Sequence, residues 1–258
     1  VTSRLKILSR MDLAEKRKPQ DGRIKTKSPE GNEVELRLSS MPTAFGEKLV
    51  IRIFDPDVLQ RSFEDLGLIN DDYKRWTEMA QRPNGILLVT GPTGSGKTTT
   101  LYSTLKQLAT DDVNVCTIED PIEMVEPSFN QMQVHAKIDL SFASGVRALM
   151  RQDPDIIMIG EIRDPETAEM AVQAALTGHL VISTIHTNDA PSAISRMLEL
   201  GVPSYLIRAT VIGIMAQRLV RTLCPHCKSE TAVDTEIWQD LTQPWKVAKP
   251  EKVFKAEG

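Results

Sequence analysis

The spacing of hydrophobic residues changes near residue 70 of this chain. Before that point, apolar and polar residues alternate over 34–38 and 49–53, which predicts two half-buried strands. The Ser-Pro-Glu-Gly-Asn turn at 28–32 leads into the first of them and predicts an antiparallel meander with the residues before it. Apolar residues at helical spacing over 4–17 add one helix. We therefore expect a small α+β unit at the start of the chain.

Beyond residue 70, strand-like and helix-like segments alternate. Short apolar runs predict strands at 86–90, 113–118, 156–160 and 180–185. Longer segments bounded by capping residues predict helices at 71–81, 97–109, 141–152, 165–177, 190–200 and 204–220. This order is typical of an α/β fold with a mostly parallel sheet and helices on both faces. Ligands of such sheets bind beyond the carboxyl ends of the strands, so we expect the functional residues there.

The composition is that of a globular protein, with 41% hydrophobic and 26% charged residues in a chain of 258. No apolar run approaches the roughly 18 residues that cross a bilayer, and residues 1–10 lack the apolar core of a signal peptide. We therefore expect a cytoplasmic protein without a membrane span. The net charge of −4 argues against non-specific nucleic-acid binding, and the 3 cysteines cannot form a disulfide framework.

The most specific motif is Gly91-Pro92-Thr93-Gly94-Ser95-Gly96-Lys97-Thr98, which fits the phosphate-binding pattern G-x-x-x-x-G-K-[ST]. Its glycines let backbone N–H groups approach phosphate oxygens, and with Thr99 it forms the candidate nucleotide site. Lys97 can reach the β- and γ-phosphates, and the Thr98 hydroxyl can ligate Mg²⁺. The strand before the loop and the helix after it supply the context that the motif needs. The chain is expected to bind ATP or GTP.

Acidic residues follow two of the predicted strands. Glu161 comes after an apolar strand and Gly160, in the Walker B arrangement, although the usual Asp is absent. We expect Glu161 to reach Mg²⁺ through water or to orient the attacking water. Glu119, at the end of the preceding strand, is the second candidate for polarising that water. Each acid has a simpler interpretation, as the cap of a strand or part of a solvated turn.

Histidines and arginines supply the remaining candidates. His179 opens the last predicted strand and His186 closes it, where a neutral His can donate a hydrogen bond to the γ-phosphate; taken singly, each is more often structural. Arg147 and Arg151 are four residues apart on one predicted helix and so share a face. Five arginines are candidates for neutralising the charge that grows as phosphate leaves, from the same chain or a neighbour, although a solvated basic face is the default for each: Arg23, Arg37, Arg147, Arg151 and Arg163.

Four ordered blocks resemble the secretion ATPase superfamily. Residues 91–98, 119–123, 151–164 and 177–189 correspond to its Walker A, Asp box, Walker B and His box. Within it, the chain is most similar to the type II secretion and type IV pilus assembly ATPases, since Pro19-Gln20-Asp21-Gly22-Arg23 and Ser40-Met41-Pro42-Thr43 also match that branch. The resemblance implies a partial PAS-like domain at 1–56, a linker at 57–68, a RecA-like ATPase domain at 69–222 and a C-terminal segment at 223–258.

The resemblance also implies roles for the candidate residues. Lys97 and Thr98 would bind phosphate and Mg²⁺, while Glu119 and Glu161 would serve the attacking water. The two histidines would sense the γ-phosphate, and Arg23 and Arg37 would reach in from the amino-terminal domain. Such chains form rings of six at the inner face of the cytoplasmic membrane. There, by the same resemblance, ATP hydrolysis would drive an inner-membrane platform, with docking proteins as further partners, for type II secretion or for adding pilin-like subunits to a type IV pilus.

The C-terminal segment departs from the family pattern. The assembly branch carries two Cys-x-x-Cys pairs that hold zinc, whereas here only Cys224 and Cys227 occur, which is half of a tetrahedral site. Zn²⁺ is therefore doubtful in this chain, and an expression fragment or truncated product is expected. The presence of one pair still favours the assembly or secretion branch over pilus retraction motors.

Other functions fit parts of the pattern. A RecA-like ring can translocate nucleic acid, but the acidic net charge and the lack of aromatic residues among basic ones argue against a nucleic-acid partner. A retraction motor would share the chemistry and differ in its partner. A nucleotide-gated module without turnover is disfavoured because Lys97 and Glu161 are both present.

Overall fold

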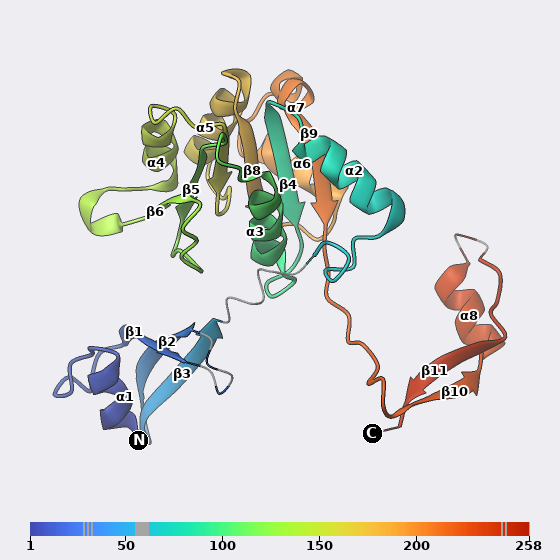
Figure 1. Ribbon diagram of the computed structural model, residues 1–258, viewed down its shortest axis with the longest axis horizontal. Helices are drawn as coiled ribbons and strands as arrows, with labels where there is room; N and C mark the ends of the chain where they lie inside the picture. Colours follow the sequence, from blue (N-terminus) through green and yellow to red (C-terminus); the bar gives the residue numbers. More distant parts are fainter. Residues whose placement is uncertain are drawn as a thin grey trace. The chain divides into compact units, whose positions relative to one another are not determined.

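The structure is a computed structural model that describes residues 1–27, 29, 31, 33–54, 62–243, 245 and 247–257 (Figure 1). It divides into two compact units, Val1–Arg218 and Leu219–Gly258. Parts of the predicted turn at 28–32 and of the predicted linker at 57–68 lie outside the described residues. Within the described part of the chain, no helix combines the length and apolar character that crossing a bilayer requires.

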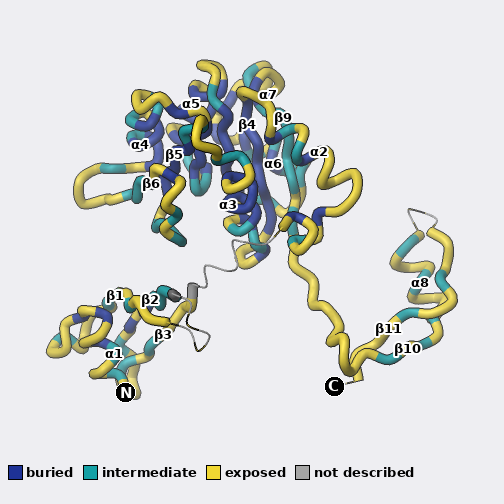
Figure 2. The backbone as a smooth tube through the Cα atoms, in the orientation of Figure 1, coloured by how far each residue is buried: buried dark blue, intermediate teal, exposed yellow. Residues whose placement is uncertain are grey.

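A six-stranded parallel sheet forms the centre of the larger unit. Its strands are β4 (Gly85–Thr90), β5 (Val115–Glu119), β6 (Asn130–Gln133), β7 (Ile156–Ile159), β8 (Leu180–Ile185) and β9 (Val211–Ala216). They lie in the order β6-β5-β7-β8-β4-β9, and every neighbouring pair is parallel. All residues of β4, β5, β7 and β8 are buried (Figure 2), which explains their continuous apolar sequences. The prediction of a mostly parallel sheet is confirmed.

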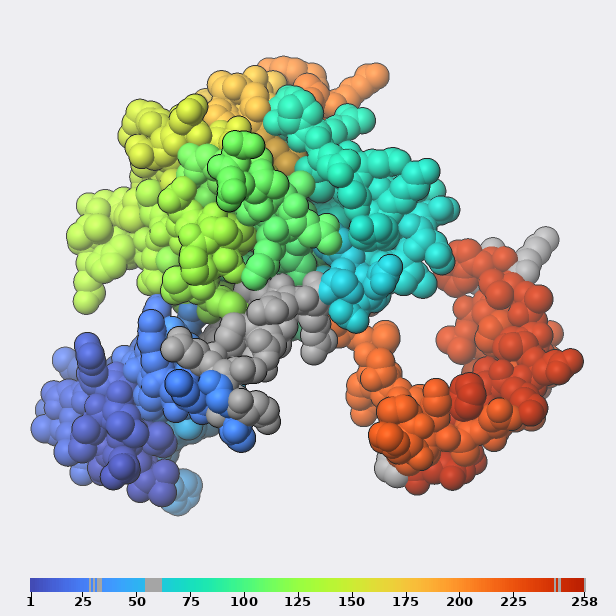
Figure 3. Space-filling view, in the orientation of Figure 1, coloured from blue at the N-terminus to red at the C-terminus, as the bar shows by residue number. Residues whose placement is uncertain are grey.

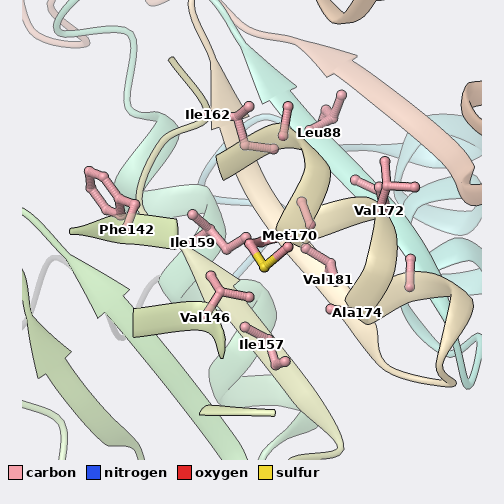
Figure 4. Packing of buried hydrophobic residues seen from close by; sticks show 14 of the residues in the cluster. Leu88, Phe142, Val146, Ile157, Ile159, Ile162, Met170, Val172, Ala174 and Val181 are labelled. Carbon is pink, nitrogen blue, oxygen red and sulfur yellow. The ribbon is translucent and has the colours of Figure 1, made fainter. Parts of the chain in front are cut away.

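Helices cover both faces of this sheet, as predicted. They are α2 (Asn70–Ala80), α3 (Lys97–Leu108), α4 (Phe142–Leu149), α5 (Pro165–Leu176), α6 (Ala190–Glu199) and α7 (Ser204–Thr210), with a 3-10 turn at Ala136–Ile138. Because side chains alternate along a strand, Ile86 and Leu88 pack with α4 to α7, whereas Leu87 and Val89 pack with α2 and α3. Figure 4 shows part of the first cluster, in which side chains of α4 and α5 meet those of β7.

The helices α2 and α3 lie side by side on their face of the sheet. The space-filling view shows the α2 surface, in teal, against the green surface that includes α3 (Figure 3). Trp76 of α2 is 1% exposed, and its indole N–H donates to Thr104 Oγ1 of α3 at 3.0 Å. A buried indole with a satisfied donor fixes the two helices together. It also fixes the helix that carries the phosphate-binding motif.

The amino-terminal part contains an antiparallel meander, as predicted. Its elements are α1 (Thr2–Leu8), β1 (Gln20–Lys27), β2 (Glu33–Thr43) and β3 (Gly46–Phe54), with β2 in the centre. The helix predicted over 4–17 ends at Leu8, because Arg10 takes a left-handed φ of 59° that no α-helix continues through. Buried Lys6 donates to the Glu15 carbonyl at 2.8 Å and pairs with Glu47, so α1 is held against β3.

The smaller unit contains a hairpin-like pair and one helix. β10 (Lys228–Ala232) and β11 (Lys252–Ala256) pair antiparallel, and α8 (Thr235–Thr242) lies between them in sequence. Asp234 caps α8 by accepting from the N–H groups of Glu236 and Ile237.

Three elements around the parallel sheet also differ from the sequence prediction. The helix predicted at 204–220 is wrong beyond Thr210, because the chain continues as strand β9 beside β4. Its β-branched residues suit a strand, and the sheet edge supplies backbone partners that a longer helix would leave unused. Strand β6 was not predicted, since its sequence Asn-Gln-Met-Gln is polar. Helix α4 ends at Leu149, so Arg151 lies outside it and shares no helix face with Arg147.

Candidate nucleotide site

The phosphate-binding motif lies where the sequence places it, between β4 and α3. Gly91, Gly94 and Gly96 have positive φ angles of 144°, 76° and 84°, which favour glycine. A Cβ on Gly91 would lie 2.2 Å from the Gln217 carbonyl oxygen, so that position admits no side chain. A Cβ on Gly94 would meet nothing within 4 Å. The loop therefore packs tightly on its β9 side and is open at Gly94.

Lys97 begins α3 and is held against the loop. Its Nζ donates to the carbonyl oxygens of Gly91, at 2.8 Å, and Pro92, at 3.0 Å. Burial lowers the pKa of Lys97 from its usual value, and the Glu161 carboxylate partly opposes this shift. A desolvated ammonium interacts strongly with nearby anions, so this position suits contact with phosphate oxygens.

A pocket of about 550 Å³ opens at the carboxyl ends of the strands beside this loop. Its walls contain half of the candidate residues that the sequence analysis selected, namely Thr93, Gly94, Ser95, Gly96, Lys97, Thr98, Thr99, Glu119, Glu161 and His186. These come from the loop, from the ends of β5 and β7, and from the residue after β8. Parallel strands bring residues that are far apart in sequence to one edge of the sheet.

Glu161 follows the carboxyl end of β7 and is held there by two neighbouring side chains. Its Oε2 lies 3.0 Å from His186 Nε2, and its Oε1 accepts from Arg163 Nη1 at 3.0 Å. The Arg163 guanidinium also lies 3.6 Å from the Asp120 carboxylate and 5.6 Å from the centre of the Phe142 ring. One donor thus faces each oxygen of Glu161, and its side chain remains 24% exposed.

Arg163 lies beside a second pocket, of about 510 Å³, which shares His186 with the first. Arg163 forms its ion pairs with Glu161 and Asp120 inside the same chain.

Glu119 lies in the pocket wall in a different setting. It is 3% exposed, and its carboxylate accepts hydrogen bonds from Tyr102 Oη, Thr117 Oγ1 and Gln131 Nε2 at 2.7, 2.7 and 3.1 Å. Sequence analysis missed Tyr102 and Gln131. Tyr102 follows Lys97 by five residues on α3, but no spacing rule links it to a strand end 17 residues away.

Other candidates do not line this pocket. His179 precedes β8, where its Nδ1 lies 2.9 Å from the Ala174 carbonyl oxygen. Strands rise about 3.3 Å per residue, so β8 holds His179 and His186 roughly 20 Å apart, at opposite ends of this strand. The geometry of one chain therefore brings His186 to the site and leaves His179 away from it. The γ-phosphate-sensing role that the resemblance implies for His179 therefore stays a prediction that this pocket does not support.

The remaining arginines have partners outside the phosphate loop. Arg147 pairs with Glu166 at 3.8 Å, and Arg151 Nη1 donates to the Arg147 carbonyl at 2.9 Å. Arg37 Nη1 donates to Glu123 Oε2 at 3.0 Å. Arg23 Nη2 donates to Gln133 Oε1 at 3.3 Å.

The cysteines lie in two environments. Cys116 is buried in β5, whereas Cys224 and Cys227 are exposed. Backbone N–H groups of His226 and Cys227 lower the pKa of Cys224, which favours the thiolate that metals bind. Among the described residues, no cluster of three or more His, Cys, Asp or Glu side chains is arranged to hold a metal ion.

A parallel sheet with this glycine-rich loop between strand β4 and helix α3 defines a P-loop nucleotide-binding fold of the RecA-like class. The chain matches the family described as "Type II/IV secretion system protein" over residues 1–255. It therefore belongs to that family.

Named relatives agree with this assignment. "Type IV pilus assembly ATPase TfpB" of Acinetobacter baylyi is 67% identical over 258 residues, which are 100% of this chain and 44% of the relative. "Type II secretion system protein E" of Pseudomonas aeruginosa is 51% identical over 234 residues, or 91% of this chain and 46% of the relative. The chain spans about half the length of these curated relatives.

Solved structures agree on the fold. The pilus retraction motor PilT, with bound ADP, is similar with a TM-score of 0.65 and 32% identity, over 79% of this chain and 60% of PilT. The ATPase DotB of Yersinia pseudotuberculosis is similar with a TM-score of 0.68 and 25% identity, over 93% of this chain and 69% of DotB.

Proposed function

We propose that this chain hydrolyses ATP as part of a ring-forming cytoplasmic motor that powers type II secretion or type IV pilus assembly. The observation that carries the proposal is the single pocket in which Lys97, Thr98 and Glu161 meet beside an open glycine loop. The names of the similar proteins support the same activity. ATP is preferred over GTP because those relatives are named ATPases.

We assign separate tasks to the phosphate-binding loop, Lys97, Glu161, His186 and Arg163. Amide N–H groups of residues 93–98 and the Lys97 ammonium would hold the phosphates, with Lys97 exchanging loop carbonyls for phosphate oxygens. Glu161 would orient the attacking water, because its carboxylate is partly exposed in the pocket. His186 and Arg163 would hold that carboxylate in one orientation. His186 can thereby respond to the γ-phosphate through Glu161.

The pocket also suits Mg²⁺. Hydroxyl and carboxylate oxygens are the ligands that this ion prefers, and Thr98, Asp120 and Glu161 all line the walls. Thr98 would bind the ion directly and Glu161 through water. Bound there, Mg²⁺ would neutralise part of the triphosphate charge.

The wider role follows the similar proteins. We propose a homo-oligomer, a hexamer by resemblance, that works at the inner face of the cytoplasmic membrane with a platform protein and docking proteins. The domain limits of 1–56, 57–68, 69–222 and 223–258 are proposed for the same reason. A retraction motor is less favoured, because PilT is 32% identical whereas an assembly ATPase is 67% identical.

Phosphate release from Mg²⁺·ATP by the purified protein tests the activity. Glu161→Gln should still bind a fluorescent ATP analogue but hydrolyse ATP at least about a hundredfold more slowly, because the water loses its orienting base. Glu169→Gln, an exposed acid on α5, is the matched control and should keep the wild-type rate. A Glu161→Gln protein that turns over normally, or a wild-type protein that releases no phosphate, would overturn the proposal.

A further inference from the structure

Glu119 is more completely hydrogen-bonded than a general base should be. Its Oε1 accepts from Thr117 Oγ1 and Gln131 Nε2, and its Oε2 accepts from Tyr102 Oη and, at 3.4 Å, from the Glu123 N–H. A carboxylate has about four lone-pair positions, and here four donors occupy them. To take a proton from water, Glu119 would first have to give up one of these bonds.

Glu161 provides the comparison. Each of its oxygens faces one donor, and its side chain is 24% exposed in the same pocket. Glu161 therefore keeps acceptor positions for a water molecule, whereas Glu119 has none to spare. The two acids predicted to share one role lie in environments that suit different roles.

Tyr102 joins two parts of the site that are not adjacent in sequence. It belongs to α3, the helix that begins with Lys97, and its hydroxyl lies 2.7 Å from Glu119 Oε2 and 3.1 Å from the Met124 carbonyl oxygen. Residues 120–124 follow Glu119 and line the pocket through Asp120, Glu123 and their neighbours. The Tyr102 hydroxyl thus connects the phosphate-binding helix with the acidic loop across the pocket.

The local chemistry makes this connection firm. Tyr102 is 1% exposed. Burial, together with the Glu119 carboxylate, raises the pKa of Tyr102, so the hydroxyl keeps the proton that it donates. Gln131 completes the cluster, because the two hydrogens of its amide nitrogen are shared among Glu119 Oε1, Tyr102 Oη at 3.0 Å and the Met124 carbonyl at 2.8 Å. A largely buried network of shared hydrogen bonds of this kind restrains the groups that it joins.

We propose that Tyr102 is a positioning residue for ATP hydrolysis and that Glu119 is its anchor, not a base. The pair holds residues 120–124, with their carboxylates, at a fixed place relative to the phosphate loop. This inference rests on the proposed ATPase function. It assigns the water-orienting task to Glu161 alone.

The test is Tyr102→Phe, which removes one hydroxyl and keeps the ring. We expect kcat to fall about tenfold to a hundredfold at every pH, because small misplacements of site groups cost this much. The acid limb of the pH–rate profile should stay where it is in the wild-type protein. If Glu119 were the base, removing a donor from its carboxylate would displace the acid limb. Such a shift would overturn the proposal.

Two further variants sharpen the comparison. Tyr205→Phe removes an exposed hydroxyl from α7 and should leave kcat unchanged. Thr117→Val also removes a donor to the Glu119 carboxylate. Thr117 lies on β5 together with Glu119, so this variant does not loosen α3 from the acidic loop. We expect a smaller loss of kcat than in Tyr102→Phe. Equal losses in both variants would indicate that the donors serve Glu119 itself.

A second readout does not depend on activity. Hydrogen exchange of the amides in residues 120–124 should become faster in Tyr102→Phe and stay unchanged in Tyr205→Phe. Unchanged exchange in Tyr102→Phe would contradict the anchoring role even in an active enzyme. A wild-type protein without ATPase activity but with the expected exchange pattern would contradict the proposed function and leave the anchor standing.

Discussion

Lys97 shows how a single side chain can be prepared for an anionic ligand. Its ammonium is largely removed from water, and its donors are held by the carbonyls of Gly91 and Pro92. Burial lowers its pKa, but Lys97 starts from a pKa of 10.5 and lies near the Glu161 carboxylate. A charged donor that can exchange carbonyl oxygens for phosphate oxygens gains a stronger interaction.

Lys97→Ala should therefore weaken nucleotide binding. Hydrogen bonds to charged groups are worth about 2 kcal/mol, which corresponds to roughly thirtyfold in affinity. Titration with a fluorescent ADP or ATP analogue measures the change. Lys106→Ala is the control. Lys106 lies on the same helix, but its Nζ pairs with Glu126 Oε2 at a distance of 3.3 Å and does not contact the phosphate-binding loop. Equal affinity of Lys97→Ala and wild type would exclude the proposed phosphate contact.

Residues of the site were predictable where their role is local. Lys97 and Thr98 follow from a contiguous motif, and Glu161 and His186 follow from their places at strand ends. Tyr102 was missed because its partner is set by how α3 packs on the sheet, which no local pattern records. Conversely, both ends of β8 carry a His, and only the direction of the strand distinguishes them.

Helix α4 illustrates an element-scale constraint that sequence periodicity does not show. Gly145 is an interior residue of α4, where glycine ordinarily weakens a helix. A Cβ at this position would lie 2.5 Å from Ile118 Cδ1 and 3.0 Å from Ile118 Cγ1 of β5. The missing side chain lets α4 approach the strand that ends in Glu119.

Gly145→Val should destabilise the protein by about 1–3 kcal/mol, the usual cost of overpacking a well-packed core. The midpoint of urea unfolding, followed by tryptophan fluorescence, measures this. Ala148→Val, on the same helix and half-buried, introduces the same side chain without the clash, and it lowers helix propensity whereas Gly145→Val raises it. If both variants unfold at the same urea concentration, the close approach of α4 and β5 does not limit stability.

Elements were predictable where burial imposed a regular pattern. Strands β4, β5, β7 and β8 are buried along their whole length and gave clear apolar runs. The sheet edges were not predicted, because the polar β6 has no apolar run and β9 follows α7 without a turn. Pairing with a neighbouring strand, not local propensity, makes these two segments strands.

At the scale of the whole molecule, an arginine from the same chain or from a neighbouring copy can complete the site. Arg37 of β2 donates to Glu123, a residue of the acidic loop that lines the pocket. A guanidinium that reaches a transferring phosphate from outside the loop is worth about 10³–10⁵ in rate. The family resemblance gave Arg23 and Arg37 this task, and a ring would place such arginines at the boundary between copies. Surface residues that bind another copy of the chain follow no periodic hydrophobic pattern. The sequence therefore predicts a ring of copies only through the family resemblance.

Mixing two inactive variants distinguishes the two arrangements. Arg37→Ala should bind ATP but hydrolyse it slowly, because the transferring phosphate loses a positive charge. Glu161→Gln should also bind ATP and hydrolyse it slowly, because the attacking water is no longer oriented. If Arg37 acts on the neighbouring copy, a mixed ring contains sites with an intact Glu161 from one chain and an intact Arg37 from the next. Phosphate release by the mixture should then exceed the sum of the separate rates, and specific activity should rise with protein concentration. A mixture no faster than that sum, with a rate per chain independent of concentration, would mean that each chain completes its own site.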